Sequence, residues 1–181
     1  MKKLFTTTTL LLFILLHFNS HAQERYGRTL NLGLGVAGYS GYYGYAGRSL
    51  PVFNINYEID VARNFTLAPS ASFYTFSANH DSYTYHETVI PVGVKGTYYF
   101  DELLDANDKW DFYLGSSVGF AIVNSRWEEG YNGDRNHYHG GSSLFLDVHV
   151  GSEYHINNKI GVFLDLSTGV STVGLAVHGI N

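Results

Sequence analysis

The 181-residue sequence contains no cysteine, three prolines and few charged residues. Without cysteine the chain has no disulfide framework, no thiolate metal site, no cysteine nucleophile and no lipidated N-terminal cysteine. Lysine and arginine number 11 against 16 aspartates and glutamates, which gives a formal net charge of −5. This balance argues against a nucleic-acid partner, because phosphate binding requires a basic surface.

Aromatic residues and glycine are abundant instead. The sequence is 16% aromatic and contains 15 tyrosines and 20 glycines. Such a composition excludes intrinsic disorder, and neither a collagen period nor a coiled-coil period is present. The length suits a single domain.

The first 22 residues predict a cleavable export signal. Lys2 and Lys3 precede an apolar block at residues 10–16, and Ser20-His21-Ala22 places small residues where signal peptidase cleaves. The block is too short for a permanent transmembrane helix of ~20 apolar residues. We therefore expect residues 23–181 to form the exported domain. Loss of residues 1–22 removes two lysines and no acids, which lowers the formal net charge from −5 to −7.

The exported domain has a hydropathy period of two. From Phe53 to Val61 every odd position is apolar and every even position is polar, which is typical of a strand with two unlike faces. Further segments alternate in the same way at residues 30–37, 65–76, 90–99, 112–122, 144–150, 160–166 and 173–177. The sequence thus predicts an all-β domain of eight antiparallel strands, and no segment has a helical period.

Long and short connections alternate between the predicted strands. Residues 39–49, 77–88 and 124–142 are long and polar, 62–64 and 156–159 are tight turns, 101–111 is of medium length and 168–172 is short. An even number of antiparallel strands, with short turns at one rim and long loops at the other, is typical of transmembrane β-barrels of the bacterial outer membrane.

The content of the polar face predicts that the apolar face points outward. A soluble, lipocalin-like barrel would turn its apolar face inward and carry many charges outside. Here the polar face is rich in Gly, Ser, Asn and Ala, which suits the narrow lumen of an eight-stranded barrel. Aromatic residues near the strand ends, such as Tyr98, Trp110 and Tyr154 at one end and Phe53 and Trp127 at the other, suit interfacial girdles.

Several stretches resemble the small outer membrane protein β-barrel domain family. They are Ala22-Gln23, Leu30-Asn31-Leu32-Gly33-Leu34-Gly35, Ile90-Pro91-Val92-Gly93-Val94-Lys95 and Gly174-Leu175-Ala176-Val177. In layout the chain is similar to OmpA and OmpX barrels. The resemblance implies an eight-stranded up-and-down barrel in the bacterial outer membrane, with both termini in the periplasm and long loops outside the cell. It also implies insertion by the barrel-assembly machinery, although this chain ends in His178-Gly179-Ile180-Asn181 rather than in the family's usual aromatic residue.

The alternation places an acid-rich set of polar side chains in the lumen. The set is Glu58, Asp60, Lys95, Asp147, His149, Glu153, Asp165 and His178. Because an unpaired charge is costly in a narrow lumen, we expect Lys95 to pair with Glu58 or Asp165, and His149 and His178 to bridge the remaining carboxylates. The predicted role is a polar core that orders the barrel, and the alternative is conduction of protons or ions.

Two loops contain candidate contact residues. Tyr42, Tyr43 and Tyr45 either contact a glycan or an adhesion partner, or line the outer lipid interface. His137 and His139 have a spacing that suits zinc or copper, but no third ligand is fixed, so a solvated loop that contacts lipopolysaccharide sugars is the preferred interpretation. We expect neither a metal nor a cofactor.

The sequence predicts a non-catalytic outer-membrane barrel. His80-Asp81-Ser82 and His86-Glu87 do not supply a strand-borne nucleophile with its base. The expected role is structural or one of surface interaction through the loops, with outer-membrane lipid, lipopolysaccharide and an extracellular ligand or host surface as partners. A narrow porin-like channel is the first alternative, and a soluble lipocalin-like ligand-binding barrel is the second.

Overall fold

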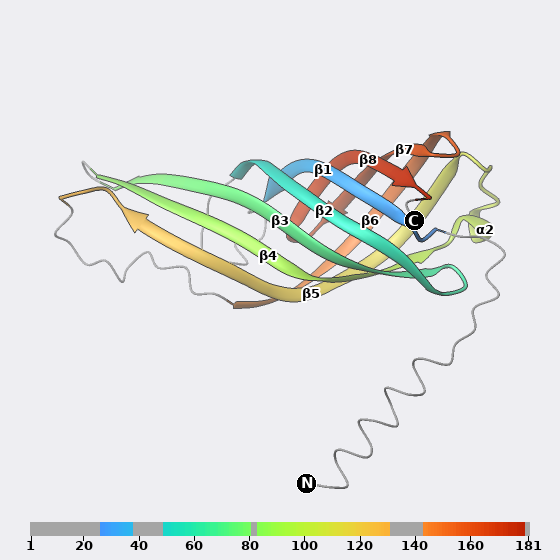
Figure 1. Cartoon of the computed structure of the whole chain (residues 1–181), viewed down its shortest axis with the longest axis horizontal. Helices are drawn as coiled ribbons and strands as arrows, with labels where there is room; N and C mark the ends of the chain where they lie inside the picture. The colour runs from blue at the N-terminus through green and yellow to red at the C-terminus, as the bar shows by residue number, and fades with distance from the viewer. Residues whose placement is uncertain (1–25, 38–48, 81–82, 131–142, 180–181) are drawn as a thin grey trace, which may run out of the picture.

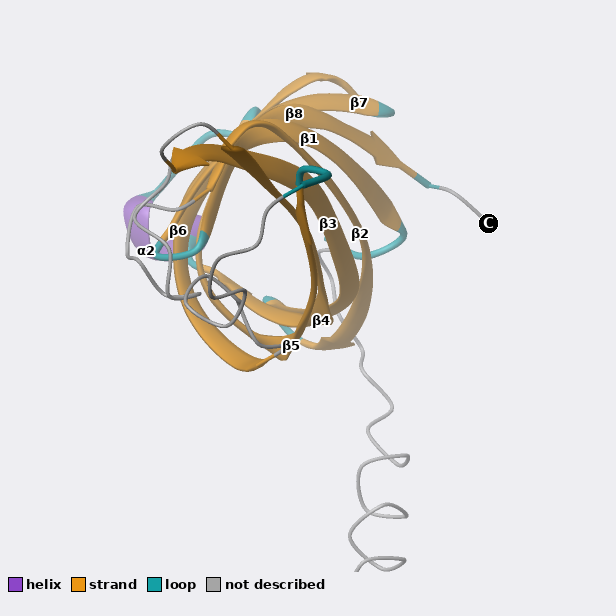
Figure 2. Cartoon of the chain, turned by 90° about the vertical axis from the view of Figure 1, so that its left-hand side faces the viewer, coloured by secondary structure: helices purple, strands orange, loops and turns teal. Residues whose placement is uncertain are grey.

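The structure is a closed antiparallel β-barrel of eight strands (Figure 1). It is a computed structural model that describes residues 26–37, 49–80, 83–130 and 143–179. The strands are β1 (Thr29–Ala37), β2 (Ser49–Ala62), β3 (Phe65–His80), β4 (Tyr83–Tyr99), β5 (Trp110–Trp127), β6 (Ser143–Asn157), β7 (Ile160–Ser167) and β8 (Val170–His178). Each strand pairs with its neighbours in sequence, and β1 pairs with β8 to complete the ring (Figure 2).

The short-turn rim is the end of the barrel at which the described chain begins and ends (Figure 1). A tight turn joins β2 to β3 there, and Asn64 adopts the left-handed conformation that Asn tolerates (φ 56°). The four-residue helix α2 (Asp101–Leu104) follows β4 at the same rim. Among the described residues, no helix is long and apolar enough to cross a membrane.

Some of the predicted features lie outside the described residues. These are the signal peptide at residues 1–22 and the loop residues Tyr42, Tyr43, Tyr45, His137 and His139.

The prediction of a long loop at residues 77–88 is wrong. β3 continues to His80, and β4 begins at Tyr83 in the same register as the rest of the hairpin. β5 likewise runs on to Trp127, which pairs with Tyr85. Residues 77–80, 83–88 and 124–127 therefore form a projection of three strands, which we call the β3–β5 extension (Figure 1).

Polar outward side chains explain why the β3–β5 extension has no strand-like hydropathy pattern. Residues 84, 86 and 88 on its outer face are Thr, His and Thr, whereas Tyr85 and Glu87 are buried on its inner face. Trp127, expected in an interfacial girdle, is instead buried against Tyr85, with ring centroids 5.1 Å apart. A strand surrounded by water needs no apolar face, so the sequence signal disappears.

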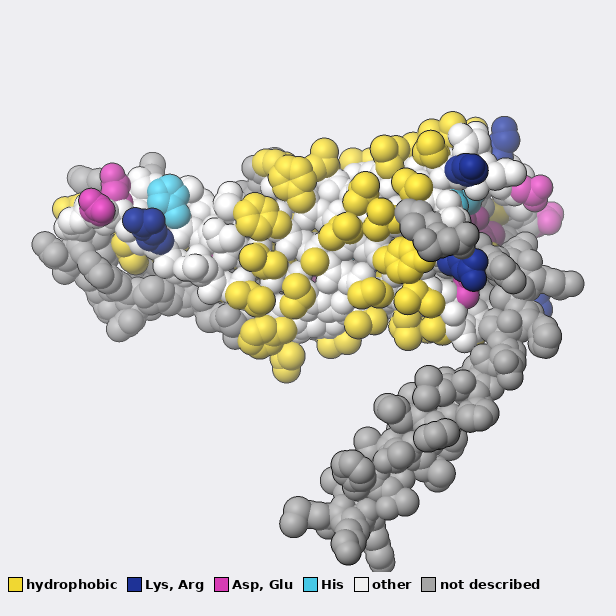
Figure 3. All heavy atoms as spheres, viewed as in Figure 1, with side chains coloured by type: hydrophobic (Ala, Val, Ile, Leu, Met, Phe, Trp, Pro, Cys, Tyr) yellow, Lys and Arg dark blue, Asp and Glu magenta, His cyan; other side chains and the backbone are white. Residues whose placement is uncertain are grey.

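Apolar side chains cover the outside of the barrel. In β6, Leu144, Leu146 and Val148 are 76%, 58% and 58% exposed, whereas the intervening Phe145 and Asp147 are buried. Figure 3 shows hydrophobic side chains spread over the middle of the barrel, with charged side chains towards its two ends. We call this surface the apolar belt. It includes Leu32, Leu34, Phe53, Ile55, Ile59, Leu67, Phe73, Val92, Val94, Leu114, Val118, Phe120, Ile122, Leu146, Val148, Val150, Leu164, Leu166, Val173 and Leu175.

The apolar belt is the reverse of the pattern in a water-soluble barrel. A soluble protein rarely exposes a contiguous apolar patch larger than a few hundred Å². The structure therefore confirms the prediction that the apolar face of the strands points outward. At the short-turn rim, the outward-facing Trp110 ring lies 5.0 Å from the Tyr154 ring, as expected of an aromatic girdle.

Paired glycines make room for aromatic rings inside the barrel. Gly93 on β4 faces Gly119 on β5, and a Cβ atom at position 119 would lie 2.7 Å from the ring of Phe145 and would overlap the Val92 carbonyl oxygen. Gly33 and Gly174 form an equivalent pair beneath Phe163. Each of these two rings therefore lies over a glycine pair on the two strands next to its own on one side.

We expect Gly119→Ala to destabilise the folded barrel by about 1–3 kcal/mol, the usual cost of overpacking. The added methyl group meets backbone as well as the Phe145 ring, so neither can yield easily. Gly96→Ala is the matched control, since its Cβ would meet side chains and no backbone: the Phe65 ring edge at 3.1 Å and Leu67 Cδ2 at 3.5 Å. Thermal unfolding in detergent should separate the two variants, and equal melting temperatures would contradict this account.

Candidate functional site

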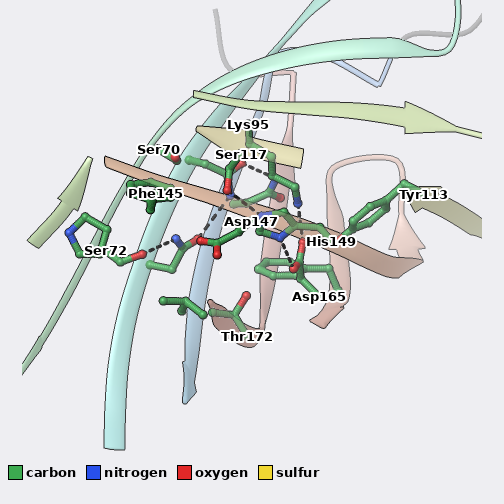
Figure 4. A pocket seen from close by; sticks show the side chains of 16 residues that line it. Ser70, Ser72, Lys95, Tyr113, Ser117, Phe145, Asp147, His149, Asp165 and Thr172 are labelled. Carbon is green, nitrogen blue, oxygen red and sulfur yellow. Dashed lines mark hydrogen bonds and ion pairs between the residues drawn. The ribbon is translucent and has the colours of Figure 1, made fainter. Parts of the chain in front are cut away.

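The lumen contains a network of buried polar side chains centred on Asp165 of β7. Its partners come from three other strands: Lys95 from β4, Tyr113 from β5 and His149 from β6 (Figure 4). These residues meet because each occupies an inward position in its own strand. All four are buried.

The negative charge of Asp165 is balanced by Lys95, and both carboxylate oxygens have hydrogen-bond partners. Its Oδ2 atom forms an ion pair with Lys95 Nζ and accepts a hydrogen bond from the Tyr113 hydroxyl at 3.0 Å. Its Oδ1 atom lies 2.8 Å from His149 Nδ1, and His149 Nε2 lies 2.8 Å from Ser117 Oγ. The Lys95 ammonium also sits 4.6 Å from the centre of the Tyr113 ring, a favourable cation–π distance. The Asp165 carboxylate therefore connects its own strand, β7, to β4, β5 and β6.

Glu58 forms a second centre nearer the short-turn rim. Its Oε1 atom accepts a hydrogen bond from Asn31 Nδ2 at 2.8 Å. Its Oε2 atom accepts hydrogen bonds from Thr66 Oγ1 at 2.6 Å and from the Tyr99 hydroxyl at 2.7 Å. Three donors satisfy this buried carboxylate, so burial does not leave its oxygens unpaired.

The structure brings together most of the predicted lumenal residues. Of the two partners expected for Lys95, it selects Asp165 rather than Glu58. His149 contacts that same carboxylate, whereas His178 Nε2 lies 2.6 Å from Glu153 Oε1. Asp147 is also buried, and Thr168 Oγ1 donates to it at 3.3 Å.

Tyrosines are the functional residues that the sequence reading missed. Tyr99 and Tyr113 face inward, and the Tyr26 ring stacks on Tyr99 with centroids 3.9 Å apart. The Tyr26 hydroxyl donates to Asp101 Oδ2 at 2.7 Å, and the Tyr26 and Gly27 amides donate to Asp60 Oδ1. The sequence signal was present, because positions 99 and 113 have lumenal parity in their strands.

The polar network lies between two nonpolar layers. Tyr26, Tyr99 and Tyr113 form one layer at the short-turn rim. Val52, Tyr74, Val89, Ala121 and Phe145 form the other layer, toward the β3–β5 extension. The described residues leave a polar-lined cavity of about 50 Å³ between them. At about 10–15 Å³ per water, such a cavity holds only a few water molecules.

His86 and Glu87 are adjacent in the sequence and point to opposite faces of β4. His86 is exposed, and its Nδ1 atom lies 2.8 Å from Ser77 Oγ. Glu87 points to the opposite face of β4, where it accepts a hydrogen bond from the Tyr85 hydroxyl at 2.5 Å. Adjacent residues of a strand face opposite ways, which explains this separation of the two side chains.

Comparisons with known proteins support the fold. Neither the protein-family models nor the curated proteins include a match to this chain. The crystal structure of Neisserial surface protein A (NspA) is similar, with a TM-score of 0.53 and 14% identity over 83% of this chain and 95% of that one. This chain has the fold of a small outer-membrane β-barrel. At 14% identity the likeness concerns the fold alone.

Two further solved structures have lower similarity scores. The N-terminal β-barrel domain of Pseudomonas aeruginosa OprF has a TM-score of 0.44 and 14% identity over 83% of this chain and 96% of that one. The attachment invasion locus protein Ail of Yersinia pestis, solved with the heparin analogue sucrose octasulfate, has a TM-score of 0.44 and 12% identity over 82% and 94% of the two chains.

We expect Lys95→Met to lower the free energy of unfolding by about 3–5 kcal/mol, the usual cost of removing one partner of a buried ion pair. The side chains of Lys95 and Asp165 are 8% and 6% exposed, so solvent screens the pair little. The double variant Lys95→Met, Asp165→Asn should recover part of the loss, because it leaves no unpaired charge. Lys109→Met, at an exposed position, is the control. Unchanged thermal unfolding of Lys95→Met in detergent would show that the ion pair contributes nothing.

Proposed function

We propose that this protein is a bacterial outer-membrane barrel that neither conducts ions nor catalyses a reaction, and that presents a surface for interaction outside the cell. The observation that carries the proposal is the combination of an apolar exterior with a lumen filled by a polar network between two nonpolar layers. Such a barrel can be stable in lipid without having a transport path.

The location in the membrane follows from the apolar belt. In lipid, backbone polar groups must bond to one another, and a closed barrel meets that requirement. The antiparallel ring and its outward Leu, Val, Ile and Phe side chains suit this solvent. The partners on this surface are then outer-membrane lipid and lipopolysaccharide, and the barrel-assembly machinery inserts the chain. Residues 1–22 serve as the export signal.

The contents of the lumen support the proposed absence of conduction. An ion that crossed the barrel would have to pass the Tyr26–Tyr99 stack and then the ion pair between Lys95 and Asp165. It would also have to pass the nonpolar layer around Phe145. The interior of an eight-stranded barrel is just wide enough for side chains to fill, and here the described side chains leave a cavity of about 50 Å³.

Surface interaction is assigned to the side of the barrel that carries the β3–β5 extension. The extension stands beyond the apolar belt (Figure 3). It exposes the polar side chains of His86 and Arg126, and the exposed Glu128 follows it directly. The loop residues Tyr42, Tyr43, Tyr45, His137 and His139 lie outside the described residues, in the connections β1–β2 and β5–β6, whose flanking strand ends Ala37, Ser49, Trp127 and Ser143 are on the same side. We propose that these groups together contact an extracellular ligand or a host surface.

Single-cysteine labelling tests the membrane location cleanly, because the sequence has no cysteine of its own. A spin label at Leu146→Cys should be accessible to oxygen dissolved in the bilayer and shielded from a water-soluble nickel reagent. A label at Glu128→Cys, an exposed position directly after the β3–β5 extension, should show the opposite pattern. Water accessibility at position 146, or recovery of the protein from the periplasm without detergent, would contradict the proposal.

Planar-bilayer recording tests the sealed lumen. The purified protein should give no discrete conductance steps, because the two nonpolar layers exclude hydrated ions. Replacing both Tyr99 and Tyr113 with alanine removes most of one layer and leaves the other, so this variant should also remain silent. Reproducible open steps from the unmodified protein would instead support the narrow-channel alternative.

A further inference from the structure

Two histidines and a glutamate converge inside the barrel at the short-turn rim, outside the network centred on Asp165. Glu153 and His155 come from β6, and His178 is the last residue of β8. Their ligand-type atoms all lie within 4.8 Å of one another. Glu153 Oε1 lies 2.6 Å from His178 Nε2 and 3.7 Å from His155 Nδ1. One carboxylate oxygen therefore faces a ring nitrogen from each histidine.

The hydrogen bonds of His178 fix which nitrogen carries its proton. Thr29 Oγ1 has a single hydrogen, and it donates that hydrogen to the Tyr26 carbonyl oxygen at 2.8 Å. The same Oγ1 atom lies 2.9 Å from His178 Nδ1 and must accept from it. His178 Nδ1 therefore carries a proton, and the other ring nitrogen, Nε2, is directed at the Glu153 carboxylate.

His155 is oriented in a similar way from the opposite side. Its Nε2 atom lies 2.7 Å from Asp111 Oδ2, and a carboxylate can only accept, so Nε2 carries the proton. The lone pair on Nδ1 then faces Glu153 Oε1. The 2.6 Å contact between His178 Nε2 and Glu153 Oε1 is a hydrogen bond that holds a proton, and a metal ion bound by the three side chains would replace that proton.

The donor set and its surroundings suit a divalent transition metal. Two imidazoles and one carboxylate form the His₂Glu set of zinc sites that keep a fourth position for water. Metal-binding histidines almost always donate their other N–H to an oxygen acceptor, and Asp111 and Thr29 are such acceptors here. Gly161 leaves the space that the Glu153 carboxylate occupies, since a Cβ atom at position 161 would overlap Oε1.

We propose that Glu153, His155 and His178 bind a zinc-class divalent metal ion at the short-turn rim of the barrel. The ion would join β6 to the end of β8 across β7. It would act close to the seam of the barrel, because His178 pairs with Thr29 in the first contact between β1 and β8. Metal binding to the folded state alone therefore stabilises the closed barrel.

The test uses the full-length exported protein, purified in detergent without a polyhistidine tag and stripped with a chelator. Titration with zinc chloride should show saturable binding with a stoichiometry near one and a rise in the melting temperature. Cobalt chloride should give visible absorption bands of a nitrogen- and oxygen-ligated ion. Each of His155→Ala, His178→Ala and Glu153→Gln should weaken zinc binding at least tenfold, and Asp111→Asn, which alters an outer partner, should weaken it about tenfold.

The matched control is the double variant His137→Ala, His139→Ala, which removes the other pair of histidines with metal-ligand spacing. It should bind zinc as the parent does. His155→Gln, which retains a polar side chain of similar size, provides a second test if an alanine variant does not fold. Absence of saturable zinc binding by the parent protein would overturn the proposal and leave a protonated histidine as the cation beside Glu153. Loss of binding in the His137 and His139 variant would overturn it as well.

Discussion

Closure of the hydrogen-bonded ring is the constraint on which the rest of the structure depends. β1 and β8 pair from Thr29 with His178 to Ala37 with Val170, and this ladder joins the first strand to the last. In an apolar solvent an unpaired backbone group costs several kcal/mol, so an open sheet edge cannot persist there. Once the ring is closed, the outer side chains are free to be apolar, and the polar side chains are confined to the inside.

Confinement in a narrow lumen explains the composition of the inner wall. Many inward positions hold small residues or polar residues with several partners, and the Phe145 and Phe163 rings lie over glycine pairs. Glu58 and Asp165 each collect three partners from different strands. The polar core therefore replaces the hydrophobic core of a soluble domain as the element that specifies one packing arrangement, although each buried charge is favourable only while it is paired.

The sequence predicted the barrel well where lipid imposes a hydropathy pattern. The alternation from Phe53 to Val61 marked β2, and the small polar residues of the other face predicted its orientation. Prediction failed at residues 77–88, where both faces of the strands meet water or each other and no alternation is required. Two contacts depend on the stagger of the strands around the ring. Lys95 pairs with Asp165 rather than with Glu58, and Glu153 meets His178 across β7. The alternation of inward and outward positions along a single strand contains no information on how neighbouring strands are staggered.

The unequal lengths of the strands give the barrel a mechanical asymmetry. The β3–β4 hairpin keeps one register from its tip, where His80 faces Tyr83, to the short-turn rim, where Phe65 faces Tyr98. β5 follows β4 with an equally constant register from Trp127 to Tyr113. A force applied to the tip along the strands therefore loads the backbone hydrogen bonds in shear. These bonds form a continuous ladder from the β3–β5 extension into the barrel. A partner attached to the β3–β5 extension would be held on one side of the barrel, because the hydrogen-bond register between these strands continues unbroken from the extension into the barrel.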